Sequence, residues 1–286
     1  MTEFSNAERA QVLTQAIPYI QQYVHETVVI KYGGNAMVNE SLKQQVMEDI
    51  VLLHTVGVNV VLVHGGGPDI NDLMNRLGKK PEFVNGLRVT DEETIEIAQM
   101  VLAGKVNKDL VKIIQAKGAP AIGLSGIDGR MLKAQFKNEE LGFVGEIIDV
   151  NVQVLRDVME KGYVPVISTI ASNKDAYTYN INGDTAAGVI AGALKAKRLI
   201  MLTDTEGVLL DKDNPGSLLP KLTINECEQL KKDGVIVGGM IPKVDCCCEA
   251  VKSGVESVVI TDGRVPHSIL MELFTDEGAG TMIVSD

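Results

Sequence analysis

Two segments of the sequence place glycines between an apolar run and the start of a helix. Segment 60–68 (VVLVHGGGP) ends an apolar run in three glycines, and Pro68 begins a helical pattern. Segment 27–35 (TVVIKYGGN) has the same order, with Lys31 at the end of the run. Glycines let backbone N–H groups approach a ligand closely, and a helix N-terminus adds partial positive charge. The pair of junctions therefore favours phosphate binding over two ordinary tight turns.

A second lysine and an acid follow in the later half of the chain. Segment 237–243 (VGGMIPK) places glycines before a helix start, with Lys243 in the first turn. A cation there opposes the helix dipole, and a bound anion would explain its position. Asp184 opens an Ala/Gly-rich helical segment, where it could simply stabilise the dipole. Segment 198–204 is a strand ending in Thr-Asp, which suits a nucleotide at the carboxyl edge of a sheet.

The two commonest phosphate motifs do not occur in this sequence. Gly104-Lys105 is followed by Val106 rather than Ser or Thr, so no P-loop is present. No strand leads into Gly-x-Gly-x-x-Gly with a downstream acid, which disfavours a dinucleotide dehydrogenase. Phosphoryl transfer depends on charge stabilisation and alignment, which two lysines and several backbone N–H groups provide.

Composition limits the class of protein. The 286 residues are enough for one large α/β domain or two packed lobes, and a net charge of −11 argues against nucleic-acid binding. No apolar run is long enough to span a membrane, so we expect a cytoplasmic protein. Cys246, Cys247 and Cys248 point about 100° apart on a helix and cannot converge on one metal. With Cys227 they are expected to be buried or half-buried free thiols.

From residue 27 onward strands and helices alternate, which predicts an α/β fold, a three-layer αβα sandwich around a mainly parallel sheet. Asn85-Gly86 between apolar runs predicts a hairpin turn, and Arg88 follows it. A lone arginine is usually solvated, but its planar fork also suits a carboxylate. Residues 133–149 predict a second hairpin at the rim of the site. The expected strands are 27–31, 58–64, 119–124, 164–168, 198–204 and 256–261, with a last one ending at 284; the expected helices are 40–55, 68–77, 91–116, 151–161 and 266–275.

The N-terminal segment stands apart from this alternation. Apolar residues spaced by three and four across 6–24 predict an amphipathic helix, which Pro18 should kink. Periodicity does not decide whether this helix packs on its own domain or docks on another subunit. We expect three units: an oligomerisation helix at 1–25, a substrate-binding and dimerising lobe at 26–174, and a nucleotide-binding lobe at 175–286.

Five motifs in order resemble the amino acid kinase family, specifically its acetylglutamate kinase branch. They are KYGGNAM at 31–37, HGGGP at 64–68, NGLRVT at 85–90, NINGD at 180–184 and GMIPK at 239–243. Each motif alone is weak, but the ordered set is specific and the match runs from 27 to 284. The resemblance implies transfer of the γ-phosphate of MgATP to the side-chain carboxylate of N-acetyl-L-glutamate, the second step of arginine biosynthesis.

The resemblance also implies roles for individual residues. Lys31 and Lys243 would flank the transferring phosphoryl group, and Asp184 would hold both of their ammonium groups in place. Gly34 and Gly66 would donate backbone N–H groups to the same phosphoryl group. A carboxylate nucleophile with a pKa of about 4.3 needs no general base. His25, His54, His64 and His267 are accordingly expected to have no catalytic role. Acetylglutamate would contact Gly66, Gly67, Arg88 and Asn180; ATP would contact Asp204, Thr205, Glu206, Gly207, Val208, Leu209, Gly238, Gly239 and Met240. Mg²⁺ would be held largely by the phosphates, with no protein metal site.

Only the family resemblance indicates that the protein is regulated by arginine. The N-terminal helix is similar to the extension of arginine-inhibited members, in which such helices join three dimers into a hexamer. Arginine would bind between that helix and the segment 267–282 and hold the lobes apart. The implied arginine site comprises Tyr19, His267, Glu277, Gly278 and Gly280. A PII signalling protein binds some relatives and is a possible further partner.

Two alternatives remain open. One is another amino acid kinase, acting on aspartate, glutamate or carbamate; segment 85–88 (NGLR) and the lack of a carboxyl-terminal regulatory domain disfavour the first two. The other is a non-catalytic arginine-binding sensor, which the retention of Lys31, Asp184 and Lys243 disfavours.

Overall fold

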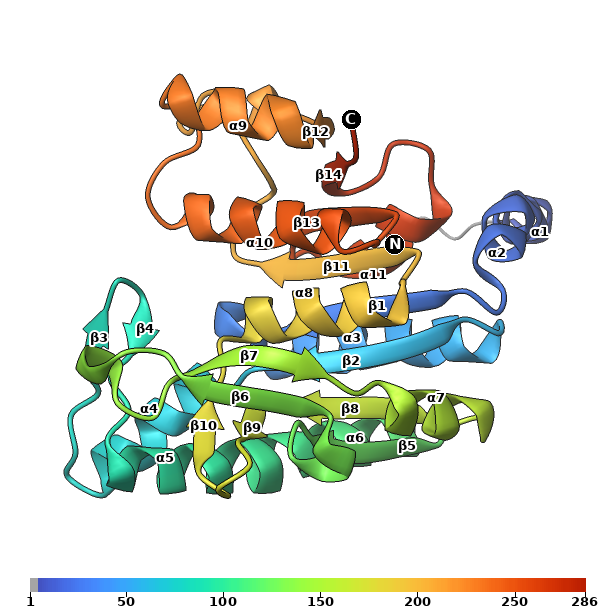
Figure 1. Ribbon diagram of the computed structural model, residues 1–286. Helices are drawn as coiled ribbons and strands as arrows, with labels where there is room; N and C mark the ends of the chain where they lie inside the picture. The colour runs from blue at the N-terminus through green and yellow to red at the C-terminus, as the bar shows by residue number, and fades with distance from the viewer. Residues whose placement is uncertain (1–4) are drawn as a thin grey trace.

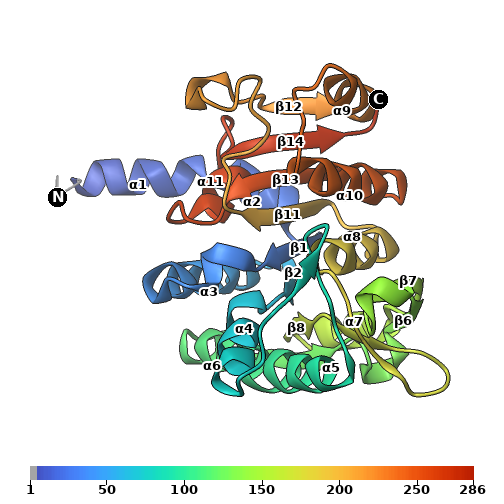
Figure 2. The ribbon, with the colours of Figure 1, turned by 90° about the vertical axis from the view of Figure 1, so that its left-hand side faces the viewer.

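The computed structural model describes residues 5–286 and contains one eight-stranded sheet between two layers of helices (Figures 1 and 2). All neighbouring strands are parallel except β13 and β14. The predicted fold class is therefore confirmed. In spatial order the strands are β12 (Lys221–Thr223), β14 (Gly280–Val284), β13 (Ser257–Asp262), β11 (Arg198–Thr203), β1 (Thr27–Tyr32), β2 (Asn59–His64), β8 (Val164–Ser168) and β5 (Ala121–Ser125).

The helices cover the sheet on both faces, as Figure 2 shows. One face carries α3 (Glu40–Thr55), α4 (Gly67–Arg76), α5 (Glu92–Gln99), α6 (Asn107–Ala116) and α11 (Ser268–Phe274). The other carries α7 (Gln153–Glu160), α8 (Gly183–Leu194) and α10 (Met240–Lys252), with α9 (Ile224–Lys232) beside β12. None of the helices within residues 5–286 is long and apolar enough to cross a bilayer.

Strand alternation divides the core into two apolar clusters and orients the chemistry. In β1, Val28 and Ile30 pack under α3 and α6, whereas Val29 packs on the side of α8. Successive side chains of a strand point to opposite faces, so Lys31 shares the face of Val29 and points toward α8.

Both predicted hairpins are present. β3 (Phe83–Val84) and β4 (Leu87–Arg88) form the first, with φ of 49° at Asn85 and 78° at Gly86, as a tight hairpin turn requires. β6 (Leu132–Phe136) and β7 (Gly145–Val150) form the second. This hairpin belongs to a four-stranded sheet with β9 (Ile170–Ser172) and β10 (Thr178–Asn180). The expected boundary at 174/175 falls between β9 and β10, and the division into lobes stays a prediction.

The expected helix 91–116 is interrupted. It consists of α5, a π-helical segment η2 (Met100–Val106) and α6, and Asp91 caps its start by accepting a hydrogen bond from the Thr94 amide. The wider π turn brings Leu102 and Val106 against Gly66, where a Cβ would lie 2.7 Å from Leu102 Cδ2. Tertiary contacts therefore override the regular helical period.

The predicted N-terminal helix is broken rather than continuous. It forms α1 (Asn6–Gln15) and α2 (Ile17–Tyr23), which separate at Ala16, just before Pro18, whose nitrogen cannot donate a hydrogen bond. α2 packs on its own domain and buries Tyr23, whereas α1 buries no residue and leaves Leu13 72% exposed. Residues 1–4 of the expected oligomerisation segment lie outside the described residues.

Candidate active site

The glycine segments meet at one edge of the large sheet. β1 lies between β2 and β11, and all three run parallel, so the residues that follow them lie side by side. The helix after β1 covers one face of the sheet, and α8, which precedes β11, covers the other. Such a switch point leaves a crevice outside the carboxyl ends of the strands, where α/β proteins bind their ligands.

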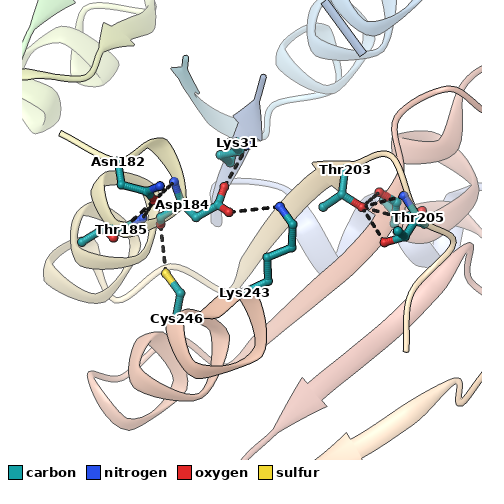
Figure 3. Close-up of polar contacts among 9 residues, drawn as sticks. Lys31, Asn182, Asp184, Thr185, Thr203, Thr205, Lys243 and Cys246 are labelled. Atoms are coloured by element: carbon teal, nitrogen blue, oxygen red, sulfur yellow. Dashed lines mark hydrogen bonds and ion pairs between the residues drawn. The ribbon is translucent and has the colours of Figure 1, made fainter. Parts of the chain in front are cut away.

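Lys31, Asp184 and Lys243 form a cluster in this crevice (Figure 3). Lys31 Nζ lies 2.8 Å from Asp184 Oδ1, and Lys243 Nζ lies 3.2 Å from Asp184 Oδ2. β1 supplies the first lysine, the first turn of α8 the aspartate, and the first turn of α10 the second lysine. Three segments far apart in sequence thus place one carboxylate between two ammonium groups.

The aspartate is held ionised between its two partners. Burial alone would raise the pKa of Asp184, but the charges and hydrogen bonds of Lys31 and Lys243 outweigh it and hold the pKa below its ordinary value. Asn182 caps α8 by accepting from the Asp184 and Thr185 amides, which fixes the aspartate backbone. Two positive charges share one negative charge, so the cluster presents a net positive charge to the crevice.

Cys246 ties the start of α10 to the start of α8. Its Sγ donates to the Asp184 backbone oxygen at 3.1 Å (Figure 3). Burial raises the pKa of this thiol to about 12, so it remains protonated and able to donate. A Cβ on Gly188 would lie 3.2 Å from the same Sγ, which shows how closely the two helices pack. Cys227, Cys247 and Cys248 are buried free thiols, as expected.

A cavity of about 160 Å³ adjoins the lysine cluster, and all four predicted acetylglutamate contacts line it. The lining includes Gly66, Gly67, Arg88 and Asn180, with apolar walls from Leu87 and Leu102. Arg88 is buried, and no carboxylate of residues 5–286 pairs with it. Asn180 Nδ2 donates to Thr90 Oγ1 at 3.4 Å. The cavity is small, with an unneutralised cation at one wall.

A larger cavity of about 730 Å³ opens on the other side of the cluster. Its lining includes Asp184 and Lys243 together with Gly238 and Gly239, two of the predicted nucleotide contacts. A Cβ on either glycine would meet nothing within 4 Å, so the backbone there is open to a ligand. Gly34, the first residue of the short 3₁₀ helix η1 (Gly34–Met37) after β1, has the same open space and a φ of +66°.

The predicted nucleotide segment 204–209 follows β11 at the same edge but does not line the larger cavity. Gly207 packs inward: its φ is +150°, and a Cβ would lie 2.5 Å from Thr281 Oγ1. The amide of Val208 donates to that hydroxyl at 2.8 Å, and Thr203 Oγ1 accepts from the Thr205 amide at 3.1 Å (Figure 3). Close packing on β14 is sufficient to explain the glycine.

His64 is fixed in a neutral form behind the glycines. Its Nδ1 donates to the Gly65 oxygen at 2.8 Å, and its Nε2 accepts from Asn107 Nδ2 at 3.1 Å. Burial lowers the pKa of His64 to about 4, so the ring carries no charge at neutral pH. Asn107 also donates to the oxygens of Leu124 and Val166. Sequence reasoning missed Asn107, because nothing in the local pattern marks a residue that follows a π turn.

The residues expected at the arginine site lie around α2 and α11. The hydroxyl of Tyr19 bonds to Asp276, next to Glu277, and this contact raises the pKa of the phenol. His267 Nδ1 lies 2.6 Å from Asp49 Oδ1 on α3. Gly280 approaches β13 so closely that a Cβ would lie 2.1 Å from the Ile260 oxygen.

A buried ion pair that sequence reasoning missed links these elements. Arg198 Nη1 donates to Glu272 Oε1 at 3.1 Å, and Arg198 Nη2 donates to the Tyr23 hydroxyl at 2.7 Å. Glu272 Oε2 accepts from the Ala279 amide at 2.9 Å. Through these contacts the Arg198–Glu272 ion pair connects α2 and the segment before β14 to the start of β11.

Comparison with known proteins shows where the chain belongs. The sequence profile of the amino acid kinase family matches residues 26–262. An acetylglutamate kinase from Clostridium beijerinckii is 53% identical over 282 residues, 98% of this chain and 99% of that protein. Two structures of N-acetylglutamate synthase from Neisseria gonorrhoeae also superpose on this chain. The one with coenzyme A and N-acetyl-glutamate is 26% identical with a TM-score of 0.85, and the one with coenzyme A and L-arginine is 25% identical with a TM-score of 0.81. The superposition covers 97% of this chain in each case, but 63% and 65% of the synthase. By profile and by full-length identity, the chain belongs to the amino acid kinase family.

Proposed function

We propose that the protein works as an acetylglutamate kinase, transferring the γ-phosphate of ATP to the side-chain carboxylate of N-acetyl-L-glutamate. The observation that carries the proposal is the Lys31–Asp184–Lys243 cluster between a small cavity with an unneutralised arginine and a larger cavity edged by glycines. The full-length relative with 53% identity supports the substrate. Two anions must meet in this reaction, and the cluster is positive where they would meet.

The small cavity would hold the acceptor. Arg88 would fork onto the α-carboxylate of acetylglutamate, and Asn180 and the amides of Gly66 and Gly67 would hold the remaining polar groups. The side-chain carboxylate of the substrate is ionised at neutral pH and attacks without a general base. The neutral, fully bonded state of His64 agrees with that.

The larger cavity would hold the nucleotide phosphates, with Gly238 and Gly239 against them. Lys31 and Lys243 would neutralise the charge that spreads over the equatorial oxygens during transfer, and the amides of Gly34 and Gly66 would add hydrogen bonds. Asp184 would keep both ammonium groups in place. The described residues offer no cluster of three or more His, Cys, Asp or Glu for a metal ion, so Mg²⁺ would arrive with the phosphates and screen their charge.

Substrate preference tests the proposal against the other kinases. We expect ADP release from ATP in the presence of N-acetylglutamate, and little release with aspartate, glutamate or carbamate, because the small cavity pairs one cation with apolar walls. A coupled ADP assay with the four acceptors measures this. A preference for any of the other three would assign the chain to a different amino acid kinase, and ADP release with none of them would favour a non-catalytic sensor.

We also propose that arginine inhibits the enzyme and that α1 joins dimers into a hexamer. Two observations support this: α1 exposes Val12 and Leu13 and buries no residue, and Tyr19 on α2 lies at the segment that ends near Gly280. The synthase that superposes on this chain was solved with L-arginine. PII binding, the two-lobe division and a cytoplasmic location remain proposals; the four free thiols favour the last.

Deleting residues 1–24 should abolish arginine inhibition and convert hexamers to dimers, because it removes both Tyr19 and α1, a helix that buries none of its residues within the part of the chain that the structure describes. Inhibition curves and light scattering measure the two effects. A matched control replaces Leu52, an exposed apolar residue on α3, with serine and should change neither. Unchanged inhibition in the truncated protein would reject the regulatory role of the helix.

A further inference from the structure

The guanidinium of Arg88 is held almost entirely by apolar groups. Its Cζ lies 4.8 Å from the centre of the Phe83 ring, and Nη1 lies 3.4 Å from Met74 Sδ. Within residues 5–286, the one oxygen that accepts a hydrogen bond from this guanidinium is the Gly67 carbonyl, 3.3 Å from Nη2. Burial lowers the pKa of Arg88. A strongly charged group is therefore buried with a weak set of partners.

An arginine in this position would ordinarily be expected to pair with an acid. Burying a charge without a counter-ion is costly, and a carboxylate beside it would remove most of that cost. No carboxylate of the described chain lies within ion-pair distance of Arg88. An internal carboxylate would, however, compete with the carboxylate of an incoming substrate. An aromatic face attracts the cation without neutralising its charge or occupying its N–H donors.

The hairpin register places that aromatic face. Phe83 on β3 pairs directly with Arg88 on β4, and both residues line the small cavity. The hairpin is seen at the left of Figure 1, at the opposite end of the view from α1 and α2. Phe83 is 54% exposed, so its ring contributes little to the core of the domain. A large apolar residue that is half exposed beside a buried cation calls for a reason other than folding.

We propose that Phe83 is a positioning residue for substrate binding: its ring fixes the guanidinium plane of Arg88 and leaves the full charge and the N–H edge to the substrate carboxylate. This inference rests on the proposed function, because it takes Arg88 as the group that binds the α-carboxylate of acetylglutamate. Met74 supports the guanidinium from α4, and Gly67 fixes one terminal nitrogen. The ring acts through Arg88 and touches no reacting atom.

Substituting Phe83 with leucine and with tyrosine separates the role of the ring from that of bulk. Leucine keeps an apolar side chain without a π face, whereas tyrosine keeps the face. We expect F83L to raise the KM for acetylglutamate about five-fold and to leave kcat and the KM for ATP within about two-fold of wild type. F83Y should stay within about two-fold of wild type in all three constants. Phe136 on β6, 44% exposed, gives the matched control F136L, which should change none of them.

Three outcomes of this experiment would contradict the positioning role of Phe83. An unchanged KM for acetylglutamate in F83L, with wild-type kcat, would overturn the positioning role while the proposed function stands. Equal increases of the KM for acetylglutamate in F83L and F83Y would also overturn it, since both substitutions would then act by changing the shape of the side chain rather than by removing the π face. A wild-type protein that does not phosphorylate acetylglutamate would overturn the proposed function, and the inference with it.

Discussion

Replacing Lys243 with methionine should lower kcat by about 100- to 1,000-fold while the protein stays folded. Methionine keeps the apolar stem of the side chain and removes the ammonium group that would face the transferring phosphoryl oxygens. Asp184 would keep Lys31 as its partner at 2.8 Å, so no buried charge is left alone. Steady-state kinetics and thermal unfolding of the variant measure the two halves of this expectation.

A second lysine on the same helix provides the control. Lys252, at the last turn of α10, pairs with Glu249 at 2.8 Å on the surface. K252M removes the same charge from the same helix and should leave kcat unchanged. Near-normal turnover in K243M, or an equal loss in K252M, would remove Lys243 from the proposed mechanism.

Replacing Asp184 with asparagine should have the second-largest effect, on stability as well as on rate. The amide carries no negative charge, so the two ammonium groups would be left without a counter-charge in a buried setting and would repel each other. Breaking such a pair costs about 3 kcal/mol in free energy of unfolding, and the partial exposure of Lys243 argues for no more than that. The lysines would also separate, so kcat should fall by about 100-fold.

The pH dependence of stability distinguishes this charge effect from a change of shape. Because the pKa of Asp184 is lower in the folded than in the unfolded chain, its ionised form stabilises the fold above the unfolded value of about 3.9. That contribution is lost as the pH falls through the lower folded-state pKa. Urea unfolding at neutral and acidic pH should show a difference between wild type and D184N that shrinks on acidification. A difference independent of pH would contradict the charge effect.

The repetitive part of the fold could be predicted closely from local pattern. Helix α3 occupies the expected 40–55 and strand β8 the expected 164–168, because each has clear periodicity and a marked end. The interruption of 91–116 could not be predicted, since the π turn goes with the packing of Leu102 and Val106 against Gly66, a residue distant in sequence. Periodicity likewise cannot predict short strands such as β12, which is three residues long.

The candidate site, too, could be predicted from the sequence only in part. Glycine segments after parallel strands place Lys31, the 64–68 loop and β11 at one edge, so the sequence order alone predicts their proximity. Contacts between side chains distant in sequence carry no local signal: Arg198 and Glu272 are 74 residues apart, and Asn107 and His64 are 43 apart. Gly207 packs against Thr281, a contact that no local pattern announces, and its contact with a nucleotide stays a prediction.

The central claim is that two ammonium groups, held by one acid, allow two anions to meet. A crystal structure with ADP, aluminium fluoride and N-acetylglutamate tests it most directly, because the fluoride group stands in for the transferring phosphoryl group. The account predicts that the Nζ atoms of Lys31 and Lys243 both lie about 3 Å from fluoride, with Asp184 still between them. A closed complex in which either Nζ atom lies beyond about 6 Å, too far for a hydrogen bond, would contradict it.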